Sequence, residues 1–220
     1  MNNYQKDAKF CIKDLREKIQ KYIESENNEF KLELNGINLL EDKLSAVKSS
    51  TAFGYCIEEF FSKKLSDDYP DIFKRVEGGT QGSSFDLLRL PHKEETTTEI
   101  MINFKASLLP ADANNGIAAL NKLFNDYSKE IRKEKLYLIC KFKYSIEQDG
   151  IVKIKEIDLF YLEQVPFCLI GQDKRNWSSE FNFKSGRLQV SKKTIKNSLK
   201  PLNEISYISF LDFLTEKCKD

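Results

Sequence analysis

Two hydrophobic segments that carry charged residues in their interior constrain the fold of this chain most strongly. Residues 85–90 read Phe-Asp-Leu-Leu-Arg-Leu, and residues 99–106 read Glu-Ile-Met-Ile-Asn-Phe-Lys-Ala. Both have the composition of β-strands, and the polar span 91–98 between them is typical of a turn, so we expect an antiparallel hairpin. A charge on a buried strand is costly unless it is paired or holds an ion. Asp86 and Lys105 are therefore candidate functional residues.

The rest of the chain predicts helices around this hairpin and more strands beside it. Apolar residues at helical spacing and strand-like runs predict the remaining elements. A single domain covering residues 1–220 is expected, because no linker divides the chain. The fold class predicted is α/β, with a mixed central β-sheet flanked by helices. The predicted helices cover residues 4–25, 49–65, Asn114 or Asn115 to 127, and 205–218, and the further strands cover 136–144 and 151–160.

Composition excludes several classes of protein. No apolar run approaches the roughly 20 residues needed to cross a bilayer, and the first 20 residues do not resemble a signal peptide, so we expect a cytoplasmic protein with no membrane partner. The five cysteines are scattered without a CxxC pair, and His92 is the only histidine, which disfavours a zinc site and a Ser-His or Cys-His nucleophile. The net charge of +1 provides no general polybasic surface.

The remaining chemistry is that of carboxylates, amides and lysines. Asp86 and Lys105 lie on neighbouring predicted strands, and Asn103 shares a face with Lys105 because side chains alternate along a strand. Glu58 and Glu59 lie on the predicted helix that precedes the hairpin. Carboxylate oxygens bind Mg²⁺, and a nearby lysine stabilises a phosphate and the attacking water. A structural ion pair and a solvent-exposed helix face are the alternative explanations.

At these residues the sequence resembles the PD-(D/E)XK nuclease superfamily, and most of all the small type II restriction endonucleases. Ser84-Phe85-Asp86 and Ile102-Asn103-Phe104-Lys105 match the two halves of the motif, and Gly54-Tyr55-Cys56-Ile57-Glu58-Glu59 matches the helix that adds a glutamate in many relatives. The resemblance covers residues 53–144. It implies a Mg²⁺-dependent, sequence-specific endonuclease of double-stranded DNA that leaves 5′-phosphate ends. Because both strands are cut, it also implies a homodimer.

The sequence departs from this pattern at Asn103, which occupies the position of the motif acid. Three explanations are open: Glu58 or Glu59 supplies the acid, Asn103 serves as a neutral ligand or orienting group, or the chain is inactive. In the last case it would be a DNA- or protein-binding module on the same fold. A repair or RNA-directed nuclease is a further alternative.

Several polar residues are candidates for contact with DNA. The glycine-dense loop before Asp86 and the Asn-Asn-Gly stretch after the hairpin each have a structural alternative, as a turn and as a helix cap. Residues 171–200 carry eight basic residues against two acidic ones, which suits contact with a phosphate backbone, although such a run is also typical of a solvated face. The candidates are Gln81, Ser83, Ser84, Asn114, Asn115, Lys174, Arg175, Asn176, Lys184 and Arg187.

Overall fold

The computed structural model describes residues 2–27, 29–31, 50–76, 83–92, 96–110, 115–129, 133–147, 151–166, 170–172, 187–190 and 198–219. The described helices are α1 (Asn3–Ser25), α3 (Ser50–Asp68), α4 (Leu120–Ser128) and α6 (Tyr207–Lys219), with the 3-10 turns η2 (Leu162–Gln164) and η6 (Leu202–Glu204). The described strands are β1 (Glu29–Lys31), β2 (Phe73–Arg75), β3 (Leu87–Arg89), β4 (Glu99–Leu108), β5 (Asn115–Ala119), β6 (Lys135–Ile146), β7 (Ile151–Tyr161), β8 (Ile170–Gln172) and β9 (Arg187–Val190).

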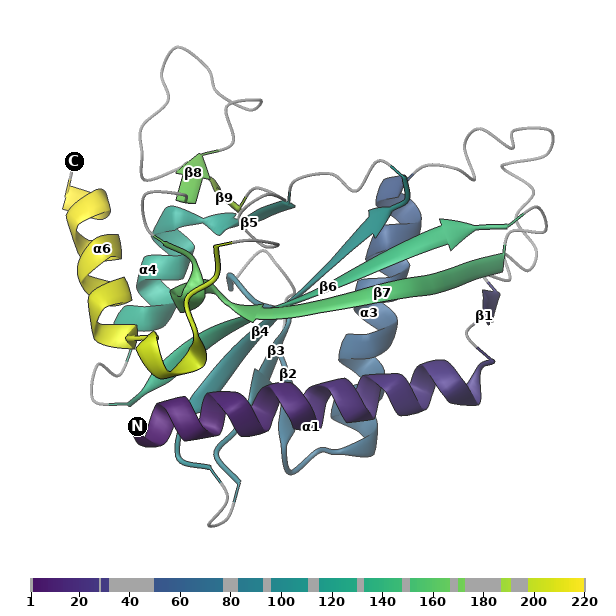
Figure 1. The fold of residues 1–220 in the computed structure, drawn as a ribbon, viewed down its shortest axis with the longest axis horizontal. Helices are drawn as coiled ribbons and strands as arrows, with labels where there is room; N and C mark the ends of the chain where they lie inside the picture. Colours follow the sequence, from purple (N-terminus) through teal and green to yellow (C-terminus); the bar gives the residue numbers. More distant parts are fainter. Residues whose placement is uncertain are drawn as a thin grey trace.

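A mixed sheet forms the centre of the molecule (Figure 1). Its described strands follow the order β1-β7-β6-β4-β3-β2. β4 and β6 run parallel, and every other neighbouring pair in this sheet is antiparallel. The predicted hairpin is confirmed, since β3 pairs antiparallel with β4. The fold class is the predicted one, a mixed α/β sheet flanked by helices.

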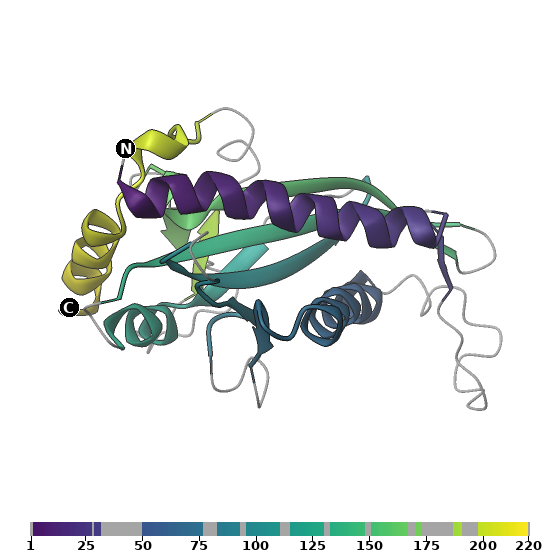
Figure 2. The same ribbon diagram turned by 90° about the horizontal axis from the view of Figure 1, so that it is seen from below.

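The helices pack on the sheet through apolar stripes. α1, which runs along the strands in Figure 2, shares one apolar core with α3, and the two helices touch where the Tyr22 hydroxyl donates to Asp68 at 3.0 Å; α4 belongs to a second cluster on the other face. Both long helices place residues three or four apart in the large core, as an amphipathic helix does. This core also takes the alternate residues of β4 and β6, so the central strands are buried on the side that these residues face. The helix residues buried in it include Leu15, Ile19 and Ile23 of α1 and Phe53, Ile57, Phe61 and Leu65 of α3.

The segment after the hairpin differs from the prediction. A helix was expected to begin at Asn114 or Asn115, but Asn115–Ala119 forms β5, and α4 begins only at Leu120. β5 pairs antiparallel with β9 in a second sheet of order β5-β9-β8. Pairing with a strand some 70 residues away overrides the local helical spacing, which is the kind of tertiary effect that a sequence pattern does not reveal.

A second apolar cluster joins this small sheet to the main one. It packs α4 and α6 against the central strands, with Leu120, Leu123, Phe210 and Leu214 fully buried.

Among the described residues, no helix is long and apolar enough to span a membrane. The described cysteines Cys11, Cys56 and Cys140 are free thiols.

Candidate active site

The site lies along one edge of β4, where the shorter strand β3 ends. β3 pairs with β4 only as far as Ile102, while β4 continues to Leu108. Beyond this point two carboxylates take the place of a neighbouring strand. Phe104 N–H donates to Oδ2 of Asp86 at 2.8 Å, and Ala106 N–H donates to Oε1 of Glu58 at 2.8 Å. Acidic groups from two different elements are thus held side by side on one strand edge.

The backbone around Asp86 fixes the direction of its side chain. The Asp86 N–H donates to the carbonyl of Ile102 at 2.9 Å, which continues the hairpin by one bond. The Asp86 carbonyl accepts from the N–H of Val76 at 3.4 Å and from the hydroxyl of Ser62, on α3, at 3.5 Å. Ser62 itself is buried. Asp86 is therefore held between the sheet and the helix that carries Glu58.

The two carboxylates and Lys105 form one electrostatic group. Burial raises the pKa of Glu58 to about 7; the charge of Lys105 opposes this shift and the neighbouring Asp86 adds to it. Burial also raises the pKa of Asp86, against the charge of Lys105 and the hydrogen bond from Phe104, and the charge of Glu59 adds a smaller increase. Lys105 is half-buried and donates from Nζ to the carbonyl of Phe104 at 2.9 Å. Raised carboxylate pKa values beside a lysine are typical of a site that receives a cation or does proton chemistry.

Of the two adjacent glutamates, the structure brings only Glu58 into this group by hydrogen bonding. Glu59 forms an ion pair with Arg75 of β2, and its side chain is 40% exposed. The difference follows from the helix, because adjacent residues point about 100° apart around its axis. The sequence alone left the choice between the two glutamates open.

Asn103 is buried and its amide group is engaged in the protein interior. Its Nδ2 has two hydrogens, which are shared among three acceptors: the carbonyl of Ser84 at 2.7 Å, the carbonyl of Ile117 at 3.2 Å and the hydroxyl of Tyr137 at 2.6 Å. Only 2% of the residue is exposed, and Oδ1 accepts no hydrogen bond from the described residues. Asn103 therefore joins the segment before Asp86 to β5 and β6.

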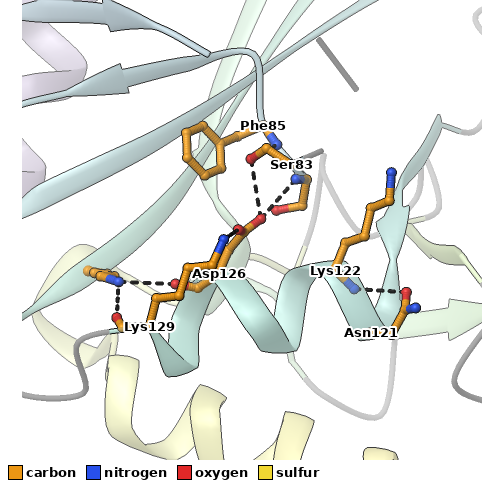
Figure 3. A network of polar contacts seen from close by, with 8 residues as sticks. Ser83, Phe85, Asn121, Lys122, Asp126 and Lys129 are labelled. Atoms are coloured by element: carbon orange, nitrogen blue, oxygen red, sulfur yellow. Dashed lines mark hydrogen bonds and ion pairs between the residues drawn. The ribbon is translucent and has the colours of Figure 1, made fainter. Parts of the chain in front are cut away.

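The serines before Asp86 lie inside the protein. Ser83 and Ser84 are 7% and 5% exposed. Oδ2 of Asp126, on α4, accepts from the Ser84 N–H at 2.8 Å and from the Ser83 hydroxyl at 3.3 Å (Figure 3). Figure 3 also shows Lys129, the residue that follows α4, whose Nζ lies 3.6 Å from Oδ1 of Asp126. Both serines are thus buried beside Asp126, and a contact of either with DNA stays a prediction.

The other predicted DNA contacts are only partly within the described residues. Asn115 and Arg187 lie on neighbouring strands, where Asn115 pairs with Val190 and Arg187 with Ala119, but the described structure does not extend to their side chains. The remaining candidates fall outside the described residues, as does most of the basic segment 171–200. They are Gln81, Asn114, Lys174, Arg175, Asn176 and Lys184.

Charged residues on the central strands were missed by the sequence reasoning. Lys141 of β6 is in register with Lys105 and is 1% exposed. Lys143 is 3% exposed and forms ion pairs with Glu156 at 2.6 Å and Asp158 at 2.8 Å. The sequence feature that could have revealed them is the alternation Cys-Lys-Phe-Lys-Tyr in a strongly apolar strand. It places both lysines on the face of the sheet that carries Lys105.

The donor set fits a hard divalent cation. Within the described residues there is no group of three or more His, Cys, Asp or Glu side chains that would form an all-protein metal site. Mg²⁺ commonly binds through one or two carboxylates, with water and substrate phosphate completing its shell. Glu58 and Asp86 offer such a pair of oxygen ligands, and each carboxylate keeps one oxygen beyond the one that accepts a backbone N–H.

Comparison with known proteins adds little to this geometry. No protein-family model and no curated protein sequence matches the chain. Among solved structures, the chain is similar to a NlaIV restriction endonuclease with a TM-score of 0.41 and 16% identity, covering 86% of this chain and 89% of that one. A likeness of this size carries no functional argument, so the function has to be argued from the residues of the site.

Proposed function

We propose that the chain is a Mg²⁺-dependent endonuclease that hydrolyses phosphodiester bonds of double-stranded DNA at specific sequences, in the manner of type II restriction enzymes. The observation that carries the proposal is the pair of carboxylates, Asp86 and Glu58, bound to alternate amides of β4 beside Lys105. Two acids and a lysine from three separate elements converge at one strand edge. Such a group suits phosphoryl chemistry better than it suits stability, because burial raises the pKa of both acids and the charge of Asp86 raises that of Glu58 further.

Each residue has a defined role in this proposal. Asp86 and Glu58 hold the cation through their carboxylate oxygens, and Glu58 must lose its proton to do so. A bound Mg²⁺ would supply positive charge to the scissile phosphate and lower the pKa of an attacking water. Lys105, the positive group that both acids share, stabilises the phosphate and orients the water. The products would be a 5′-phosphate and a 3′-hydroxyl.

Cleavage of both strands of a symmetric site requires two copies of this group. We therefore propose a homodimer whose two-fold axis coincides with that of the DNA site. The basic segment 171–200 is the part of the sequence best suited to contact the backbone, with a net charge of about +6. Binding through this segment would weaken steeply with rising salt.

The proposal is tested by incubating the purified protein with phage-length DNA in Mg²⁺ and in EDTA, alongside Asp86→Asn protein. Discrete fragments that require both Mg²⁺ and Asp86 are expected. Asn keeps one oxygen to accept from Phe104 but removes the charge that holds the ion. Fragments that persist with Asp86→Asn would contradict the assigned site. A parallel digestion of RNA separates this activity from an RNA-directed nuclease, which would degrade that substrate instead.

A second candidate is a binding module without catalysis. The neutral Asn103 at the position of the motif acid favours it, as does the absence of a three-acid cluster from the described residues. Such a protein would bind DNA or a protein partner and show no Mg²⁺-dependent cleavage. Retarded migration of DNA in a gel with no cleavage over many hours would support this candidate against the endonuclease.

A further inference from the structure

We infer that Asn103 is a positioning residue that holds the segment carrying Asp86. The inference rests on the proposed function and explains the departure from the motif. Asn103 lies on β4 directly before Phe104, the residue whose N–H binds Asp86. One short stretch of β4 therefore holds the Asp86 segment twice, once by a side chain and once by the backbone.

The Asn103 amide acts as a donor to oxygens that only a donor can satisfy. Two of the three groups around Nδ2 are backbone carbonyls, those of Ser84 and Ile117, at 2.7 and 3.2 Å. A carbonyl oxygen accepts hydrogen bonds and never donates them. An aspartate at position 103 would place a carboxylate oxygen against both. The position therefore requires a hydrogen-bond donor, which an ionised motif acid does not provide.

The Tyr137 hydroxyl completes the bonds to the Ser84 carbonyl. It accepts from Nδ2 of Asn103 at 2.6 Å and donates to the carbonyl of Ser84. Tyr137 is fully buried near the start of β6, so its ring cannot swing away. The Ser84 carbonyl thus receives two hydrogen bonds from neighbouring central strands.

Asp126 holds the other side of Ser84. Its Oδ2 accepts from the Ser84 N–H at 2.8 Å, and the residue is 6% exposed (Figure 3). Both backbone polar groups of Ser84 are therefore fixed, two residues before Asp86. We call the group formed by Asn103, Tyr137, Asp126 and Ser84 the Ser84 clamp. Its effect is to set where the Asp86 carboxylate lies relative to β4.

The side-chain oxygen of Asn103 favours a different role, that of a metal ligand. Oδ1 of Asn103 is buried and accepts no hydrogen bond from the described residues, so it is an oxygen free to bind a metal. If that were its role, aspartate at this position would bind the cation more tightly, because it adds a negative charge. The two roles therefore predict opposite effects of the same substitution.

The experiment compares wild-type protein with Asn103→Asp and Tyr137→Phe. Three quantities are measured: Mn²⁺ affinity by calorimetry, the rate of DNA cleavage, and the hydrogen exchange of individual amides. Tyr137→Phe removes one hydroxyl from the clamp without changing any possible ligand, and it serves if Asn103→Asp does not fold. The Ala106 amide is the internal control, because Glu58 holds it independently of the clamp.

For Asn103→Asp, we expect Mn²⁺ affinity no higher than wild type and cleavage about tenfold slower or worse, since small displacements of catalytic groups cost this much or more. In Tyr137→Phe we expect faster exchange at Phe104 and unchanged exchange at Ala106. Tighter Mn²⁺ binding or faster cleavage by Asn103→Asp would overturn the inference, as would equal acceleration of both amides or of neither. If wild-type protein shows no Mg²⁺-dependent cleavage, the proposed function fails, while the exchange data still decide whether the clamp positions Asp86.

Discussion

The carboxylates of Asp86 and Glu58 accept the N–H groups of Phe104 and Ala106, two alternate residues on the same edge of β4. Asp86 reaches this edge from the segment before β3, and Glu58 reaches it from α3. The hydrogen-bonding period of a strand therefore sets the spacing of the two acids. On this edge of β4 the two carboxylates accept the N–H groups that a neighbouring strand would otherwise accept. The strand therefore holds the pair of ligands rigidly.

Glu58 and Glu59 provide a matched pair of substitutions on α3. We expect Glu58→Gln to slow Mg²⁺-dependent cleavage by about a hundredfold or more, because it removes a charge that binds the cation while an oxygen remains to accept from Ala106. Glu59→Gln should stay within about threefold of wild type, since Glu59 is bonded to Arg75 at the surface. Single-turnover rates on one DNA fragment test this. Similar losses in both variants would contradict the placement of Glu58.

The raised pKa of Glu58 predicts a pH dependence of metal binding. A carboxylate binds a cation only after losing its proton, and burial raises the pKa of Glu58 to about 7. Mn²⁺ affinity should therefore rise as the pH increases from 6 to 8. Titrations at several pH values test the expectation, with Glu58→Gln as the control that loses this dependence. A wild-type affinity that is constant from pH 6 to 8 would count against it.

The same shift predicts how stability depends on pH in the absence of metal. The pKa of Glu58 is raised from 4.5 to about 7, so between these pH values the folded state binds more protons than the unfolded state. The contribution of Glu58 to the free energy of unfolding therefore falls as the pH rises through this window and stays low above it. Asp86, whose pKa is also raised, acts in the same direction.

Glu58→Gln should accordingly be more stable than wild type at pH 8 by about 1–3 kcal/mol, and the difference should shrink towards pH 5. Urea denaturation at the two pH values measures it. A Glu58→Gln variant less stable than wild type at pH 8 would mean that the fold favours the charged form of the Glu58 carboxylate. That result would contradict its raised pKa. Functional residues commonly cost a protein stability, so a gain in stability on removal of the acid is expected at a functional site.

Lys105 should act on the chemical step. We expect Lys105→Met to lower kcat about a hundredfold or more with a smaller effect on KM, because the positive charge is needed most where negative charge develops on the phosphate. Lys13→Met removes a charge from the exposed face of α1, where the Lys13 side chain is 77% exposed, and should leave both constants within about threefold. A Lys105 variant that changes KM alone would assign the residue to binding.

Asp126 should contribute to stability through the Ser84 clamp. Asp126→Ala leaves the buried Ser84 N–H without its acceptor, which typically costs about 1–3 kcal/mol. The free energy of unfolding measured in urea should fall by this amount. Lys122→Ala on the same helix serves as a comparison that leaves the Ser84 bonds intact. Equal losses in the two variants would mean that the bond to Ser84 does not matter for folding.

Much of the fold was accessible from the sequence because its signals are local. The apolar stripes of α1 and α3 and the strands β3, β4, β6 and β7 lie close to their predicted positions. The short strands β1, β2, β8 and β9 had no such signal, since three or four residues carry too little pattern. β5 was predicted as part of a helix, because its pairing with β9 is set by tertiary structure.

The site was only partly accessible for a similar reason. Asp86 and Lys105 stand out because charge interrupts an apolar strand, and the structure brings both close to Glu58. The choice of Glu58 over Glu59 depended on how α3 is rotated against β4, which sequence spacing does not fix. Asp126 and Tyr137 were missed, because an acid on an amphipathic helix and a tyrosine in a strand are common in any fold. Their partner is a backbone group, which has no signature in the sequence.

The central claim is that Asp86 and Glu58 hold the cation with which this chain cuts DNA. Its most direct test is the Mg²⁺-dependent cleavage rate of wild-type and Asp86→Asn protein on the same DNA fragment at pH 8, where Glu58 is largely ionised. We predict discrete cleavage by the wild type that stops in EDTA, and a rate at least about a hundredfold lower for Asp86→Asn. Equal rates for the two proteins, or cleavage that continues in EDTA, would contradict the account.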